Sequence, residues 1–567
     1  MKINNIKTFV IIAFASVLLN GCTNFLDTKI DANMTPDMID TNRGNLWSFG
    51  AAMYSPMLSE SGFTILDGNF FAAASDEAQR TQASGYTYTF NRGTISPDNV
   101  EVASNYIYQY CYEGIRAVNF FLDYAKNGEQ LLALNRDTAN DVIQYAKDIR
   151  NLNWYRAEAH ICRAYYYMEL IKRFGGVPIV ETTLDQDPNP GNIPCASYDS
   201  VVNYIVNEID SNVDNLQISW RTSTDAVSGQ DGRFEKKSAL AIKARVLLYA
   251  ASPLNNSTND KSKWERAASA ANDEINFMNY TMSSRTSTYS NYFLGVTSTT
   301  NAETIFLLRT GAGNYLQRNN YPIVTPGGNS GVTPTENLVS AYEYIGTQNP
   351  LNPYANRDPR FAATIVYNGS TWNGRVIDES PGGTDDMRKP NASKTGYYLK
   401  KFLRDNMNLT QGTTDANVWV IFRYSEILLM YAEAMNEAYG PDATVAGYKY
   451  TARQALTLVR NSISTALPAV TTTDVAEFRK AVKHECQVEF AFEDHRYWDL
   501  LRWKDAETVL NTPVKGVIVT KDGSGNYVYQ VNDNAGERVF QTRNYHLPFA
   551  RAEVVNSGGA ITQNEGY

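Results

Sequence analysis

The chain has 567 residues, of which 43% are hydrophobic and 20% are charged, and its formal net charge is −9. These are ordinary values for a folded globular protein, and the length is sufficient for a large hydrophobic core. Because binding to a phosphate backbone or an anionic membrane surface requires a basic protein surface, the negative charge argues against both kinds of partner. We therefore expect no nucleic-acid partner.

The first 21 residues have the pattern of a bacterial lipoprotein signal peptide. Two lysines precede an unbroken apolar or small-residue run at 9–19. At ~1.5 Å per residue this run is too short to cross a ~30 Å hydrocarbon core, but it suits a secretory signal. The sequence LNGC at 19–22 resembles the lipobox, in which the cysteine is acylated and becomes the first residue after cleavage. We expect Cys22 to carry lipid; the alternative is an ordinary signal peptide followed by a chance cysteine.

Most of the mature chain has the hydrophobic period of an α-helix. In "NWYRAEAHICRAYYYMELIKRFGGVP" apolar residues recur every three or four positions, until Gly175 and Gly176 end the helix and Pro178 prevents its resumption. Similar patterns predict helices near 103–125, 199–217, 236–251, 263–278, 419–439, 449–463, 474–493 and 497–510. Several of these fall into pairs about as long as a tetratricopeptide-repeat unit, which predicts a scaffold of degenerate helical pairs.

Two other regions do not have this period. Residues 280–400 are rich in Gly, Pro, Asn, Thr and Tyr, which predicts a loop-rich insertion. The sequence "VIVTKDGSGNYVYQV" alternates around a DGSGN turn and predicts a small β-hairpin.

No stretch carries a recognisable catalytic or metal-binding pattern. The four histidines have no paired metal-ligand spacing, and the GxSxG and Walker A patterns are absent. The cysteines at 111, 162 and 486 fall within helical patterns without CxxC spacing, which predicts buried apolar groups. We expect no catalytic residue, no cofactor and no metal site.

One helical pattern combines many charges. In "HECQVEFAFEDHRYWDLLRW" the residues Glu485, Glu489 and Glu493 fall on one helix face, and Arg496 and Arg502 follow. An active site is conceivable there, but an ion-pair network that locks two helices together is the favoured interpretation.

Eight stretches, in order along the mature chain, resemble the SusD/RagB family of outer-membrane nutrient-binding lipoproteins. They are "CTNFLDTK" at 22–29, "SDEA" at 75–78, "RAYYYMELIKRFGGVPIV" at 163–180, "KKSALAIKARVLLYAASP" at 236–253, "NRDPRFAATIVYNG" at 356–369, "FRYSEILLMYAEAMNE" at 422–437, "VEFAFEDHRYWDLLRW" at 488–503 and "YHLPFARAEV" at 545–554. The resemblance implies a mostly α-helical chain with one SusD-like domain at 35–567, after a lipidated linker at 22–34. Its tetratricopeptide-type helical scaffold, at about 103–278 and 419–510, would carry loop-rich insertions, chiefly at about 280–400, and small β-hairpins.

The resemblance also implies a function. Members of the family are surface-exposed lipoproteins of the outer membrane without a catalytic role, and they cap a SusC-like TonB-dependent transporter. They capture oligosaccharides or polysaccharide, or peptides in RagB-like members, at the loop-rich face. The sequence leaves peptide import open as an alternative. A secreted glycan-cleaving enzyme is a third possibility, but no pair of positioned carboxylates is legible.

The sequence "ASGYTYTFNRG" offers a candidate surface for stacking sugars. Tyr86, Tyr88 and Phe90 alternate, so an extended segment would place three rings on one face, with Asn91, Arg92 and Arg80 nearby. Arg80 and Asn91 are the candidates for bonding hydroxyls. The same alternation equally fits a core strand. Family members also bind ligand through aromatic residues of the middle insertion, where the candidates are Tyr289, Tyr292, Tyr315, Tyr321 and Trp372.

The lipobox leads to a direct prediction for Cys22. A Cys22→Ala protein should lose palmitate labelling and leave the membrane fraction. Dual or triple acylation is required for stable attachment, since a single chain holds only marginally at ~0.8 kcal/mol per buried CH₂. Metabolic labelling and membrane fractionation measure both effects, and a mutant that keeps its label and its membrane association would contradict the assignment.

Overall fold

The computed structural model describes residues 43–567, apart from 58–61, 64, 67–68, 101–104, 185–192, 223–229 and 231. The predicted signal peptide at 1–21, Cys22 and the linker at 22–34 lie outside these described residues. No helix in the described part of the chain is long and apolar enough to cross a membrane.

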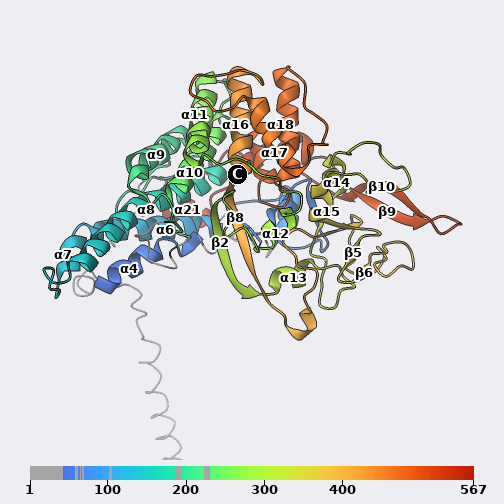
Figure 1. The fold of residues 1–567 in the computed structure, drawn as a ribbon, viewed down its shortest axis with the longest axis horizontal. Helices are drawn as coiled ribbons and strands as arrows, with labels where there is room; N and C mark the ends of the chain where they lie inside the picture. Colours follow the sequence, from blue (N-terminus) through green and yellow to red (C-terminus); the bar gives the residue numbers. More distant parts are fainter. Residues whose placement is uncertain are drawn as a thin grey trace, which may run out of the picture.

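The molecule has a helical part and an irregular part that lie side by side (Figure 1). The helical part, on the left and at the top of the view, is built from long helices of both halves of the chain. Its helices are α4 (Arg43–Ala52), α6 (Asn105–Ala125), α7 (Gly128–Ala133), α8 (Val142–Phe174), α9 (Tyr198–Asn212), α10 (Lys236–Ala251), α11 (Lys261–Met278), α16 (Tyr424–Tyr439), α17 (Ala452–Ile463), α18 (Val475–Glu489), α19 (Arg496–Arg502), α20 (Ala506–Val509) and α21 (Arg551–Asn556).

The irregular part contains short helices and short strands. The helical turns outside the scaffold are η2 (Phe71–Ala74), α5 (Tyr86–Asn91), η3 (Val213–Asn215), α12 (Tyr289–Phe293), α13 (Tyr315–Asn320), α14 (Glu336–Ala341), α15 (Pro359–Thr364), η4 (Leu409–Gln411) and η5 (Thr542–Tyr545). The described strands form five antiparallel pairs. These are β1 (Ala78–Arg80) with β3 (Val332–Pro334), β2 (Thr304–Gly313) with β8 (Asp415–Arg423), β4 (Ile365–Tyr367) with β7 (Tyr397–Leu399), β5 (Thr371–Trp372) with β6 (Arg375–Val376), and β9 (Val514–Lys521) with β10 (Tyr527–Gly536).

The scaffold helices pack as consecutive pairs, as the sequence predicts. Helix α6 packs on α8, α8 on α9, α10 on α11, and α16 on both α11 and α17. Helix α8 ends at Phe174 as predicted, because Gly175 takes φ 75° and donates its N–H to the carbonyl of Ile171. Lys172 and Arg173 in its last turn complement the negative end of the helix dipole. Cys111, Cys162 and Cys486 are buried, which confirms the prediction for these three thiols.

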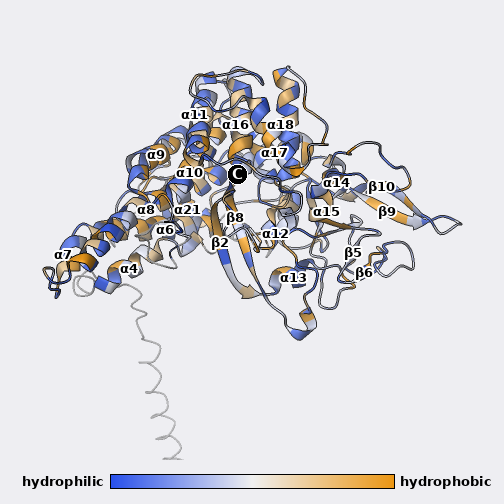
Figure 2. Ribbon diagram, viewed as in Figure 1, coloured by the Kyte–Doolittle hydropathy of each residue, from blue (hydrophilic) through white to orange (hydrophobic). Residues whose placement is uncertain are grey.

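The predicted helix at 419–439 begins later than its pattern suggests. Residues up to Arg423 belong to β8, and the helix itself starts at Tyr424. Strand β8 pairs with β2, for example Val420 opposite Leu307. The two strands form a long ribbon whose hydrophobic residues lie at the scaffold end (Figure 2). Residues 419–423 form a strand and not the predicted helical turn because they pair with β2. That partner lies more than a hundred residues earlier in the chain, so no local pattern indicates the pairing.

The predicted hairpin is confirmed in strands β9 and β10. Tyr529 lies opposite Val519 and Val531 lies opposite Val517. The Asp522 carboxylate closes the turn by accepting hydrogen bonds from the N–H groups of Ser524 at 2.9 Å and Asn526 at 2.8 Å.

The charged helix α18 forms a buried ion-pair network, which confirms the favoured interpretation of its carboxylates. Glu489 accepts hydrogen bonds from the guanidinium groups of Arg285 at 2.6 Å, Arg423 at 2.5 Å and Arg360 at 2.8 Å. Burial by itself would raise the pKa of Glu489, but these three arginines hold it well below the usual value. Glu485 binds the same Arg360 at 2.6 Å.

The partners of the network differ from those that the sequence suggests, because Arg496 pairs with Asp76, and Arg502 pairs with Glu433 and Asp499. The regular helix ends at Glu489, and Glu493 lies in the turn that follows. Glu493 accepts hydrogen bonds from Lys401 at 2.7 Å and from Arg423 at 2.7 Å. Burial lowers the pKa of Lys401 to about 8, while the neighbouring Glu493 acts in the opposite direction. The network therefore connects α18 with α15, β8 and the segment around residue 401.

Two buried carboxyl groups of the described residues, those of Glu274 and Glu379, stand outside any such network. Glu274 on α11 is fully buried, and neither of its carboxylate oxygens has a hydrogen-bond partner among the described residues. Burial raises the pKa of Glu274 well above its usual value, and Lys237 only partly opposes this shift. The ionised form of this side chain is therefore unfavourable in the folded protein.

We predict that Glu274→Gln raises the melting temperature at neutral pH but not at about pH 4. A carboxyl whose pKa is raised by folding favours the folded state below its unfolded pKa, and that contribution is lost as the pH rises. The glutamine side chain is neutral at every pH, so the variant does not lose this stability as the pH rises. Thermal melts from about pH 4 to 8 measure the difference, which amounts to ~1.4 kcal/mol for each unit of pKa shift.

The matched control is Glu265→Gln on the same helix, whose side chain is 41% exposed. This substitution should leave the pH dependence of the melting temperature as in the wild type. Identical profiles for the wild type and Glu274→Gln would contradict the prediction.

Candidate ligand-binding surface

The predicted aromatic strand at 86–90 is a short helix, which corrects the expected geometry. Residues Tyr86–Asn91 form α5 after Gly85, which takes φ 79°. Because successive helical residues are rotated by ~100°, three alternating rings cannot share a face. Phe90 is buried against Phe71, with ring centroids 5.2 Å apart, whereas Tyr88 points outward and is 38% exposed.

Two polar candidates from this stretch hold the backbone in place. Asn91 is buried, and its side-chain amide donates a hydrogen bond to the carbonyl of Ala73 at 3.1 Å. Arg80 is half-buried in β1 and donates from Nη1 to the carbonyl of Ser84 at 2.9 Å, which closes the loop before α5. Asn91 is therefore a structural residue in this protein, and Arg80 lies at the edge of the surface.

Four of the five candidates from the middle insertion lie in the hydrophobic core, which corrects their predicted role as stacking residues. Tyr289, Tyr292, Tyr321 and Trp372 are each at most 5% exposed. Their side chains contact other parts of the protein interior. The Tyr292 hydroxyl, for example, forms a hydrogen bond with Thr304 Oγ1 at 2.9 Å. The ring of Trp372 meets Tyr321 edge to face at 5.0 Å. The remaining candidate, Tyr315, is 54% exposed.

Tyr88 and Tyr315 are thus the two most exposed aromatic side chains of the described residues. Arg92 contacts the Tyr88 ring and Glu537, and we call these residues together with three neighbours in the chain the α5 surface. The α5 surface comprises Arg80, Gln82, Tyr86, Tyr88, Arg92 and Glu537. The Arg92 guanidinium lies 4.6 Å from the centre of the Tyr88 ring and 3.5 Å from the Glu537 carboxylate.

The backbone below the α5 surface is fixed by a buried arginine. Arg538 donates hydrogen bonds to the carbonyls of Ser75 at 2.8 Å and Ala78 at 2.7 Å and to Gln79 Oε1 at 2.8 Å. Burial lowers the pKa of Arg538 to about 10, which leaves it charged at neutral pH. Gly93 closes α5 at φ 60°, where a Cβ atom would lie 2.9 Å from the carbonyl oxygen of Val539.

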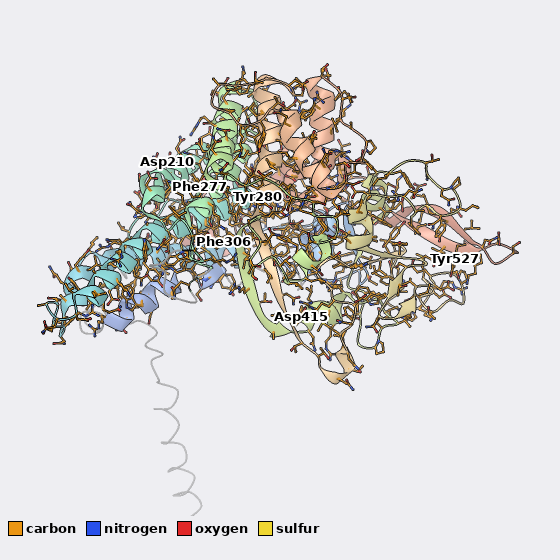
Figure 3. The ribbon with its side chains drawn as sticks, viewed as in Figure 1. Asp210, Phe277, Tyr280, Phe306, Asp415 and Tyr527 are labelled. Carbon is orange, nitrogen blue, oxygen red and sulfur yellow. The ribbon has the colours of Figure 1, made fainter. Side chains whose placement is uncertain are left out.

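Backbone contacts connect this surface to α13, which begins at Tyr315. The N–H of Thr81 donates to the carbonyl of Gly331 at 2.9 Å, and the N–H of Gly331 donates to Asn319 at the end of α13. The Gln82 amide also reaches the carbonyl of Asn329 at 3.3 Å. Helix α13 lies at the lower side of the irregular part, near the outer end of the β2/β8 ribbon that Asp415 marks (Figure 3).

The α5 surface has the chemistry of a site for a neutral polyhydroxylated ligand. Sugars present flat C–H faces that stack on aromatic rings, and their hydroxyls bond to amides, carboxylates and guanidinium groups. Tyr88 offers the ring, and Gln82, Arg92 and Glu537 offer those three kinds of polar group. Among the described residues, no group of three or more His, Cys, Asp or Glu side chains is arranged to hold a metal ion.

Glu537 was not among the residues that the sequence singled out, whereas Arg92 was expected near the rings. Glu537 follows β10 near the end of the chain, and no local pattern joins it to residues 86–92. The contact of Arg92 with Tyr88 comes from the helix and not from the expected extended segment, because a residue one turn after Tyr88 on a helix lies beside it.

Comparison with known proteins supports a relationship along most of the chain. A family model described as "SusD family" matches residues 275–567, and one described as "Starch-binding associating with outer membrane" matches residues 24–248. The SusD-like protein P38 of Formosa agariphila is 24% identical over 377 residues, which cover 64% of this chain and 69% of that protein.

Solved structures share the fold. A SusD-like protein from Bacteroides fragilis superposes with a TM-score of 0.75 at 24% identity, covering 95% of this chain and 100% of that chain. A SusD-like carbohydrate-binding protein from the same species gives a TM-score of 0.72 at 22% identity, covering 91% of this chain and 99% of that chain. These likenesses confirm the predicted mostly α-helical, SusD-like fold.

Proposed function

Because the chain belongs to the SusD family, we propose that it captures oligosaccharides or polysaccharide at the cell surface and passes them to a SusC-like TonB-dependent transporter. The observation that carries the proposal is the α5 surface. The exposed ring of Tyr88 lies beside Arg92, and the Arg92 guanidinium pairs with the Glu537 carboxylate at 3.5 Å. Both charged side chains are partly solvated and can bond sugar hydroxyls in addition to each other. The protein acts by binding and carries no catalytic residue.

Two features support a location at the cell surface, on the outer membrane. One family model is described as associating with the outer membrane, and the lipobox supplies a lipid at Cys22. A lipid-held protein is confined to the plane of the membrane that holds its transporter. Confinement raises the effective concentration of the partner, so a modest interface is sufficient for the two proteins to remain together.

Glycan binding is tested with soluble protein and a panel of amylopectin, laminarin, xylan and mannan. Wild type should bind at least one of these polysaccharides, and Tyr88→Ala should weaken that binding about tenfold. Loss of one stacked ring costs ~1–3 kcal/mol in the analogous stacking of nucleic-acid bases, and 1.4 kcal/mol is one decade in affinity. Affinity electrophoresis and calorimetry supply the measurements, with release of reducing sugar followed in parallel.

Phe90→Ala is the matched control two residues away. Its ring is buried, and such a truncation costs ~3–5 kcal/mol of stability, so this variant should melt lower, whereas Tyr88→Ala should melt like the wild type. The proposal fails if no polysaccharide binds, if sugar is released, or if a mixture of peptides binds in place of the glycans.

Partnership with a transporter is tested in membranes. Purification of the lipidated protein from gently solubilised outer membranes should bring a TonB-dependent barrel protein with it. The Cys22→Ala protein should recover much less of the barrel, because it loses the confinement that lipid provides. Repeated purifications of the lipidated protein without any barrel partner would rule out the proposed assembly.

A further inference from the structure

A second group of tyrosines, most of them half-buried, gathers at the C-terminal hairpin, away from the candidates that the sequence suggested. Tyr527 and Tyr529 belong to β10, and their ring centroids are 6.4 Å apart. The ring of Tyr529 lies 5.1 Å from Tyr354, which in turn lies 4.6 Å from Tyr367. We call these four side chains the tyrosine row. Tyr527 lies on the hairpin at the far right of the molecule (Figure 3).

The hairpin geometry explains why the two strand tyrosines lie together. Tyr527 and Tyr529 are two residues apart in a strand, so both side chains lie on the same face, and Val528 between them points to the opposite face. Val517 and Val519 of β9 are buried on the tyrosine side, and they hold the hairpin against the body of the protein.

Three of the four rings of the row keep part of their surface open to solvent. Tyr367, Tyr527 and Tyr529 are half-buried, whereas Phe361, which stacks on Tyr367 at 4.8 Å from below, is only 1% exposed. Tyr354 is buried and connects the rings of the hairpin with that of Tyr367. The tyrosine row therefore presents partly exposed aromatic surface that packs on buried rings.

Polar groups border the row in the manner of a sugar site. The side-chain amide of Asn368 donates a hydrogen bond to the Tyr529 hydroxyl at 3.2 Å. Lys521 pairs with the Asp378 carboxylate at 2.8 Å, and its ammonium lies 5.0 Å from the centre of the Tyr527 ring. Aromatic rings next to an amide, an ammonium and a carboxylate supply both the stacking and the hydroxyl contacts that a carbohydrate needs.

The tyrosine row and the α5 surface lie at the two ends of the same strand. Strand β10 begins at Tyr527 and ends at Gly536, and the next residue, Glu537, pairs with Arg92 beside Tyr88. Strand β10 bulges between Asn532 and Gly536, so the stretch from Tyr529 to Gly536 matches the five steps from Val519 to Val514 on β9. At ~3.3 Å per residue, the separation of Tyr529 and Glu537 is on the order of 20 Å. A ligand long enough to follow this strand can reach both aromatic surfaces at once.

We propose that the tyrosine row is a second carbohydrate-binding platform, which together with the α5 surface holds one extended polysaccharide chain at two points. This inference rests on the proposed function, because it assumes that the α5 surface binds glycan. Once one end of a chain is bound, binding of the other end is intramolecular and its effective concentration is high. The protein therefore prefers long chains over the short oligosaccharides that contact one platform.

The test compares the polysaccharide of the panel that wild type binds with the trisaccharide of the same linkage. Tyr527→Ala should weaken binding of the polymer about tenfold, because one ring and the two-point attachment are lost. Affinity for the trisaccharide at the α5 surface should stay within twofold. Tyr527→Phe keeps the ring and should bind the polymer like wild type.

Val528→Ala is the matched control, since this exposed side chain lies on the opposite face of the same strand. It should change neither affinity. If Tyr527→Ala melts well below wild type, Tyr367→Ala on the body of the protein takes its place in the same measurement.

The outcomes separate this inference from the proposed function. Absence of polysaccharide binding by the wild type defeats the proposed function itself. Polymer binding that is weakened by Tyr88→Ala but unchanged by Tyr527→Ala and Tyr367→Ala overturns only the second platform. Equal loss of trisaccharide and polymer affinity in Tyr527→Ala also overturns it, because that result means one site and not two.

Discussion

The buried carboxylate of Glu489 is the point at which the two parts of the molecule are joined. It binds three arginines that come from the segment before α12, from α15 and from β8, all of them far apart in the sequence. Removing charges from water carries a penalty that is offset only when every partner is present with good geometry. The helical scaffold and the irregular part therefore have to assemble together, and a partly formed network would be unfavourable.

Contacts close to this joint hold the segment that leads to the α5 surface. Arg496, at the start of α19, holds the Asp76 carboxylate through two hydrogen bonds of 2.8 and 2.9 Å. Glu77 accepts a hydrogen bond from the N–H of Phe492 at 2.9 Å, in the turn after α18. The chain then leads directly into β1 and α5. The exposed ring of Tyr88 is thus carried by a segment that is tied to the rigid scaffold within about a dozen residues, which suits a pre-formed binding surface.

The ten candidate residues show how far sequence reasoning reaches at a site. Composition and local setting drew attention to the tyrosines, and two of them, Tyr88 and Tyr315, are the most exposed aromatic rings of the described chain. The same reasoning also selected Tyr289 and Tyr321, which are buried. A tyrosine in a Gly- and Asn-rich segment has the same local appearance whether the segment lies on the surface or folds inward, because exposure is decided by what packs against it.

The sequence by itself determined the helical scaffold, the end of α8 at Gly175, the C-terminal hairpin and the structural use of the α18 carboxylates. The first three depend on residues within a few turns of one another, where period, capping and turn residues act directly. For the α18 carboxylates the sequence indicated only a structural role, and their arginine partners come from segments far apart in the chain. The tertiary structure decided the rest. It selected a helix for residues 86–91 and a strand for 415–423, because six to nine residues carry too little local preference to resist long-range packing. It also brought Glu537 to Arg92, a contact between residues more than four hundred positions apart.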